Sequence, residues 1–63
     1  MNSREVIRLI EADGWFRVAH KGSHMPVFKH AAKAVRVTVP HPSQDIPTGT
    51  LRGIERQARM RFR

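Results

Sequence analysis

The alternation of apolar and polar positions predicts a helix over residues 2–13. Its apolar residues recur at the i, i+3, i+4 spacing of an amphipathic helix. This stripe consists of Val6, Ile7, Leu9 and Ile10. Asn2 followed three residues later by Glu5 is typical of a helix N-terminus. Gly14 is a common residue directly after a helix, so we expect the helix to end there.

The apolar period then changes to the two-residue period of β-strands. Residues 15–20 alternate in the manner of a half-buried strand, with Phe16 and Val18 set against Arg17 and Ala19. Lys21-Gly22 resembles a two-residue hairpin turn, and a second strand is expected over residues 23–30. A third strand is predicted over residues 34–39. It places Val35, Val37 and Val39 on one face and Arg36 and Thr38 on the other.

A proline-rich segment separates the strands from a second helix. Pro40, Pro42 and Pro47 predict an extended loop, because proline cannot continue the hydrogen-bonded ladder of a sheet. The second helix opens at Thr48-Gly49-Thr50 and buries Leu51, Ile54 and Ala58. The basic segment 58–63 that ends the chain is expected to be a frayed tail.

These elements predict an α+β fold in which helix, three antiparallel strands and helix form one domain over residues 1–63. Two helices on the same face of the sheet would bury the valines. The opposite face would then carry Arg17, Arg36 and Thr38 and would be open to a ligand.

Charge narrows the class of partner. The chain of 63 residues has a net charge of +7, which favours binding to nucleic acid phosphates, an acidic membrane or an acidic protein. One Trp and three Phe are too few for a platform that stacks single-stranded bases. No cysteine, signal peptide or apolar run of membrane-spanning length is found. We therefore expect a cytoplasmic protein that does not enter membranes.

The four histidines do not predict a metal site. His20 and His24 are four residues apart, but a turn separates them and no cysteine or carboxylate cluster completes a ligand set. A Ser-His-Asp triad is no better supported, because Ser23 and His24 are neighbours in a strand and point to opposite faces. No metal or cofactor is therefore predicted.

RNA cleavage requires fewer catalytic groups from the protein than most enzymatic reactions do. RNA carries its own nucleophile, the 2′-hydroxyl, so the protein supplies a base, an acid and cations around the phosphate. Histidine can serve as base or acid at neutral pH, and Arg or Lys can stabilise the charge. By composition alone, however, each histidine is more simply explained as a surface residue without a role.

Four segments in order resemble the HicA toxins. They read SREVIRLIEADGW, GSH, RVTVPHP and IPTGTLRGIERQA, and the resemblance runs from Ser3 to Ala58. HicA proteins are small mRNA-cleaving toxins with a fold like the double-stranded-RNA-binding domain. The resemblance implies a cytoplasmic toxin with mRNA as substrate and a HicB-like antitoxin as protein partner. It also implies that His24 is the catalytic histidine, acting as general base or acid.

The candidate RNA-binding residues surround this histidine in the sequence or share its expected sheet face. They are Arg17, Lys21, Gly22, Ser23, Lys29 and Arg36. For the lysines in particular, a solvated charged surface is an equally good explanation. His20 and His30 are interpreted as bystanders, and His41 as a residue that stabilises the proline-rich loop.

The chain departs from the family pattern at three places. One extra residue precedes Phe28, and a bulge at Met25-Pro26 would absorb it and turn Phe28 to the core. Without that bulge, Val27 would fill the core instead. Ala31 replaces the usual Pro, and Arg59 replaces the usual Gly after the last helix.

Two other functions are compatible with the same residues. A non-catalytic module of the same fold would bind double-stranded RNA through shape and phosphates and would not need His24. A DNA-binding regulator is a weaker alternative, since no recognition helix is evident. A cleavage assay in the presence of a chelator would distinguish them.

Overall fold

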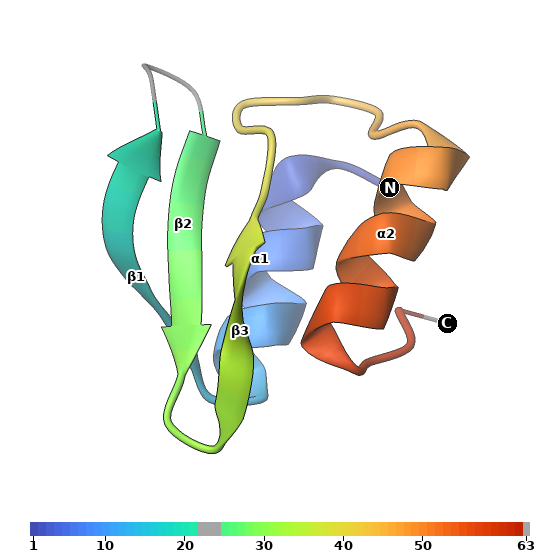
Figure 1. The fold of residues 1–63 in the computed structure, drawn as a ribbon. Helices are drawn as coiled ribbons and strands as arrows, with labels where there is room; N and C mark the ends of the chain where they lie inside the picture. The colour runs from blue at the N-terminus through green and yellow to red at the C-terminus, as the bar shows by residue number, and fades with distance from the viewer. Residues whose placement is uncertain (22–24, 63) are drawn as a thin grey trace.

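The computed structural model describes residues 1–21 and 25–62, with the backbone only for His20 and Lys21. Its elements are α1 (Ser3–Ala12), β1 (Trp15–Lys21), β2 (Met25–His30), β3 (Lys33–Thr38) and α2 (Thr48–Ala58). The three strands form one antiparallel sheet, and both helices cover the same face of it (Figure 1). The predicted α+β fold and its element order are confirmed.

Helix α1 begins and ends where the sequence indicates. The Asn2 side chain accepts a hydrogen bond from the Glu5 backbone N–H (2.8 Å) and donates one to the Glu5 carboxylate (3.0 Å). The first of these bonds satisfies one of the backbone donors that every helix N-terminus leaves free, and the second joins the two side chains. At the other end, Gly14 adopts a φ of +108°, which residues with a Cβ rarely do.

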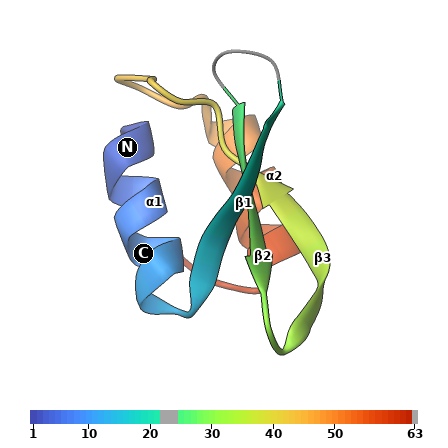
Figure 2. The same ribbon diagram turned by 90° about the vertical axis from the view of Figure 1, so that its left-hand side faces the viewer.

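The strand order β1-β2-β3 makes β2 the central strand. Three consecutive β2 residues, Pro26, Val27 and Phe28, are buried in this strand, which is flanked by β1 and β3. Figure 2 shows the twist of the sheet, with α1 beside it and α2 behind it. The predicted turn at Lys21-Gly22 and the predicted strand start at Ser23 fall partly on residues 22–24, outside the described residues.

The irregularity in the first hairpin lies in β1. Arg17 pairs with Phe28 and Ala19 with Val27, so Val18 is the additional residue of a bulge. From there to the end of β1 the register is continuous, through to Lys21 opposite Met25. The prediction of a bulge at Met25-Pro26 is therefore wrong. Phe28 is nevertheless buried in the core, as that prediction also stated.

The inward-facing residues of the outer strands also differ from the prediction. Trp15 is buried, whereas Phe16 and Val18 are 49% and 42% exposed. In β3, Val37 is buried but Val35 is 47% exposed. The register between β2 and β3 shifts before this point, between Phe28 and His30, which breaks the simple alternation of β3.

The core lies between the sheet and the helices. Its buried members are Val6, Ile10, Trp15, Phe28, Val37, Val39, Ile46, Ile54 and Ala58. They come from every element and from the loop 39–47, so each element contributes to one apolar cluster. Burial of such side chains supplies most of the free energy that favours folding.

The residues after α2 fold back along it. Arg59 has a φ of +55°, and the Met60 N–H then donates to the Glu55 carbonyl (3.0 Å). The Phe62 N–H donates to the Glu55 carboxylate (2.8 Å), and Met60 and Phe62 pack against the core. Residues 59–62 thus form a hook, in contrast to the frayed tail that the composition suggested. Among the described helices, none has the length and apolar character needed to cross a membrane.

Candidate functional site

The predicted catalytic segment joins two strand ends. Gly22, Ser23 and His24 lie outside the described residues, but Lys21 and Met25 on either side of them are paired in the sheet. Figure 1 shows these strand ends at the same end of the molecule as the loop 39–47 and the first turns of both helices.

The exposed cations predicted to contact phosphate do not share one face. Lys29 directly follows the buried Phe28 in β2 and pairs with the exposed Phe16 of β1, so it lies on the sheet face away from the helices. Arg36 precedes the buried Val37 and lies on that same outer face. Both side chains are exposed to solvent.

Arg17 lies on the other face. It pairs with Phe28, whose side chain faces the helices, and its guanidinium carbon is 5.9 Å from the centre of the Phe28 ring. The prediction that Arg17 and Arg36 share an open face is therefore wrong. The cause is the inward orientation of Trp15, which places Arg17, two residues later, in the same row.

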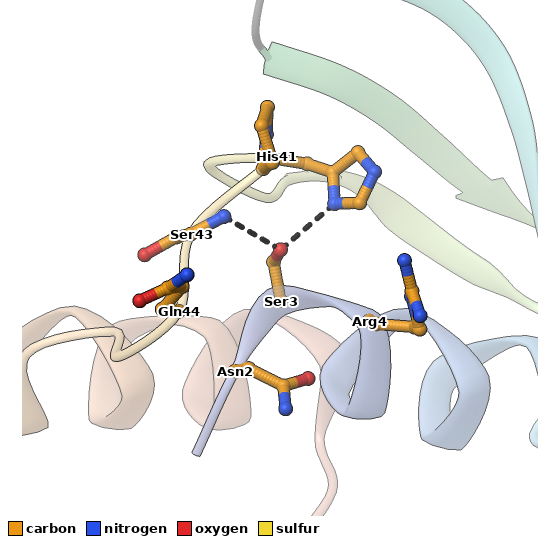
Figure 3. Close-up of a pocket in the computed structure, with 7 residues that line it drawn as sticks. Asn2, Ser3, Arg4, His41, Ser43 and Gln44 are labelled. Carbon is orange, nitrogen blue, oxygen red and sulfur yellow. Dashed lines mark hydrogen bonds between the residues drawn. The ribbon is translucent and has the colours of Figure 1, made fainter.

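The loop 39–47 is held beside β2. The Val39 N–H donates to the Pro26 carbonyl oxygen (3.2 Å), which extends the contact between β2 and β3 toward Met25. Between this loop and the start of α1 lies a cleft of about 460 Å³ (Figure 3). Its lining residues are Asn2, Ser3, Arg4, His41, Pro42, Ser43 and Gln44.

Ser3 and His41 form the polar centre of this cleft. The Ser3 side-chain oxygen is 2.8 Å from His41 Nδ1 and accepts a hydrogen bond from the Ser43 N–H (2.9 Å). The Ser3 N–H in turn donates to the Ser43 carbonyl (2.8 Å). The hydroxyl oxygen of Ser3 has two lone pairs, so it can accept from both the Ser43 N–H and a protonated Nδ1, or donate its own proton to an unprotonated Nδ1; the tautomer of His41 sets the direction of this bond.

This pair is unsuited to nucleophilic catalysis. Ser3 is only 2% exposed, so a substrate carbonyl or phosphate cannot approach its hydroxyl. The hydrogen bonds of Ser3 instead hold the loop 39–47 against the start of α1, although Ser3 and His41 are 38 positions apart in the sequence. This agrees with the interpretation of His41 as a loop-stabilising residue.

His30 is also occupied by structure. Its Nδ1 accepts from the Ala32 N–H (2.9 Å), which leaves Nε2 to donate to the Asp13 carbonyl (2.8 Å). Its ring meets Trp15 edge-on, with the ring centres 5.4 Å apart. Because both ring nitrogens are used by the backbone, His30 has no free acid or base function, as the bystander interpretation supposes.

Ser3 and Arg4 were not among the residues predicted to form a site. No local signal links the start of α1 to the proline-rich loop, because only the folded chain brings them together. Within residues 1–21 and 25–62, no group of three or more histidines and carboxylates is arranged to hold a metal ion.

Comparison with known families identifies one match. The family model described as the HicA toxin of bacterial toxin–antitoxin systems matches residues 3–60. A search of curated proteins found no match. The matched segment includes both helices, the whole sheet and the residues joining β1 to β2.

Proposed function

The chain belongs to the HicA toxin family of toxin–antitoxin systems, and from this membership we propose that it is an endoribonuclease that cleaves mRNA without a metal ion. The observation that carries the proposal is the match over residues 3–60, which includes the Gly22-Ser23-His24 segment. The toxin role follows from the family itself, and the reaction and its residues are the proposed part.

In the proposed reaction, the 2′-hydroxyl of RNA attacks the adjacent phosphorus and displaces the 5′-oxygen of the next nucleotide. His24 acts as the general base that removes the hydroxyl proton or as the acid that protonates the leaving oxygen. Lys29 and Arg36, both exposed on the outer sheet face, are the cations that we propose to stabilise charge on the phosphate. Arg17, on the other face, would contact a different part of the RNA.

The test compares wild type, His24→Ala and the control His20→Ala on a defined RNA in the presence of EDTA. We expect wild type and His20→Ala to cleave and His24→Ala to be inactive, with the same circular dichroism spectrum. Cleavage should also weaken steeply with salt, because phosphate contacts release counterions. Full cleavage by folded His24→Ala, or loss in EDTA with recovery in Mg²⁺ or Zn²⁺, would contradict the proposal.

The same samples distinguish a binding module from an enzyme. A non-catalytic double-stranded-RNA-binding module would bind RNA equally as wild type and as His24→Ala, and neither would cleave it. That outcome would replace the nuclease assignment while leaving the family membership intact.

Membership of this family implies an antitoxin partner. We assign it as a HicB-like protein that covers the outer sheet face and thereby blocks RNA. Phe16 on this face is half exposed, and Lys29 and Arg36 lie there too, which suits a partner with apolar and acidic side chains. Hydrogen exchange over residues 15–38 should slow in the complex, and RNA cleavage should stop. Undiminished cleavage by the complex would overturn this assignment.

A further inference from the structure

A second cleft lies on α2 and the hook that follows it. Its volume is about 510 Å³, and it is lined by Arg52, Glu55, Arg56, Met60 and Arg61. Arg52 and Arg56 are one helical turn apart and share a face of α2, whereas Arg61 comes from the hook. Three arginines thus line one depression.

The hook fixes the backbone that carries Arg61. The residues on either side of it, Met60 and Phe62, pack against the core and are hydrogen-bonded to Glu55 through their backbone N–H groups. Arg61 itself remains exposed. Its position beside Arg52 and Arg56 therefore follows from folding and does not depend on a ligand.

The charge of this cleft is not neutralised by its surroundings. Among the described residues, no arginine forms an ion pair, and the one carboxylate in the cleft, Glu55, accepts a hydrogen bond from Phe62. Like charges one helical turn apart oppose folding. Three arginines held together in this way are suited to a ligand that carries several negative charges.

We propose that this cleft binds phosphate groups of the RNA substrate at a second site; the proposal rests on the proposed function. Arginine presents its donors in a planar fork that fits phosphate oxygens, and successive phosphates of one strand can engage successive arginines. The cleft accordingly selects RNA by its backbone charge and not by its bases.

The location of the cleft sets a requirement on the substrate. Figure 1 shows α2 and the chain that follows it on the side of the molecule away from β1, the strand that leads to the predicted catalytic segment. The molecule measures 28 × 28 × 17 Å along its principal axes. An RNA that contacts both the cleft and the predicted catalytic segment must extend across most of the 28 Å width of the molecule. The cleft therefore favours long RNA over a dinucleotide.

The test measures RNA binding in a His24→Ala background, so that cleavage does not enter the result. Arg56→Gln is compared with Arg8→Gln, which removes the same charge from an exposed position on α1. We expect Arg56→Gln to weaken binding of a long RNA more than Arg8→Gln does. The double variant Arg52→Gln/Arg56→Gln should reduce the slope of log affinity against log salt by about 1.4, at about 0.7 for each lost contact with single-stranded RNA.

A dinucleotide bound at the predicted catalytic segment should bind all of these variants equally, because it is too short to extend from there to the cleft. Equal weakening of long RNA by Arg56→Gln and Arg8→Gln would overturn the second site and leave only general attraction to a basic protein. Absence of cleavage by wild type, by contrast, would refute the nuclease assignment without changing this binding comparison.

Discussion

Each helix of this protein is followed by a residue of positive φ, but the two residues differ. A residue of positive φ follows each helix: Gly14, at +108°, after α1 and Arg59, at +55°, after α2. This conformation reverses the chain and lets backbone N–H groups reach the last free carbonyls of the helix. Glycine adopts it without steric cost, whereas a residue with a Cβ does so at a cost of about 1 kcal/mol or more.

The surroundings explain why one site holds glycine and the other tolerates arginine. A Cβ on Gly14 would lie 2.8 Å from His30 Nε2, and His30 is held in place by Asp13 and Ala32. Arg59, by contrast, is exposed and its side chain extends into solvent. The preference for glycine is thus strong at Gly14, where a Cβ would meet His30, and modest at the exposed Arg59.

Lys33 joins the two helix ends. Its ammonium donates to the Asp13 carboxylate (2.7 Å) after α1 and to the Ala58 carbonyl (2.8 Å), the last of α2. It also lies 5.7 Å from the centre of the Trp15 ring. A cation at a helix C-terminus is favourable, because the partial charge there is negative.

The largest effect is expected where the backbone and the packing requirements coincide. Gly14→Ala forces a Cβ into an unfavourable φ and against His30, and should lower the free energy of unfolding by about 2–4 kcal/mol. Urea denaturation measures this change. Gly53→Ala is the control, because nothing lies within 4 Å of a Cβ there and alanine favours the helix. Equal destabilisation by both variants would contradict the distinction.

A smaller loss is expected for Lys33→Met, which keeps the length of the side chain and removes its charge. It eliminates the hydrogen bonds to both helix ends and should cost about 1–2 kcal/mol. Arg36→Met, at an exposed position of the same strand, should stay within about 0.5 kcal/mol. Thermal unfolding of the two variants side by side provides the measurement, and a harmless Lys33→Met would show that the helix ends are held without this residue.

Replacement of Arg59 should act in the opposite direction. Arg59→Gly relieves the positive φ and should raise the stability by about 0.5–1 kcal/mol, part of the gain being offset by the greater freedom of glycine in the unfolded chain. Arg61→Gly removes the same charge at a position without positive φ and should give no gain. If both variants are destabilised alike, the conformation of Arg59 is not a source of strain.

The smallest expected effect is on the stability of the protein at low pH. The hydrogen bond from Lys33 holds the pKa of the Asp13 carboxyl below its ordinary value of 3.8. A carboxyl with a lowered pKa in the folded state adds stability above its unfolded pKa, and this contribution disappears as the pH falls through the folded pKa. Wild type should therefore exceed Asp13→Asn in stability at neutral pH, and the difference should vanish in strong acid. A difference independent of pH would exclude this ion pair as its source.

Local signals predicted the elements but not which strand faces meet the core. Trp15 and Phe16 are adjacent aromatics, and alternation requires that they point to opposite faces without saying which one is buried. Packing selects Trp15, since its ring meets His30 and Lys33 beneath the helix ends. That choice also turned Arg17 away from Arg36 and so divided the predicted phosphate contacts between two faces.

The candidate site was predicted in part for the same reason. The Gly22-Ser23-His24 motif is local and could be recognised in the sequence, together with the strand ends that carry it. Ser3 and His41, which build the cleft beside the proline-rich loop, are joined by a 2.8 Å contact between distant positions. Neither hydrophobic periodicity nor helix-capping residues can predict a contact between two positions so far apart in the sequence.

The sequence by itself determined the order of the elements, the start of α1 at Asn2 and its stop at Gly14, because periodicity, capping and backbone freedom act over a few neighbouring residues. Tertiary structure alone decided that Val18 forms a bulge, that Val35 is exposed, that Lys33 joins both helix ends and that the last residues fold back along α2. These features depend on packing between residues that are distant in the sequence, and a chain of this size can bury only a small number of side chains in a single core.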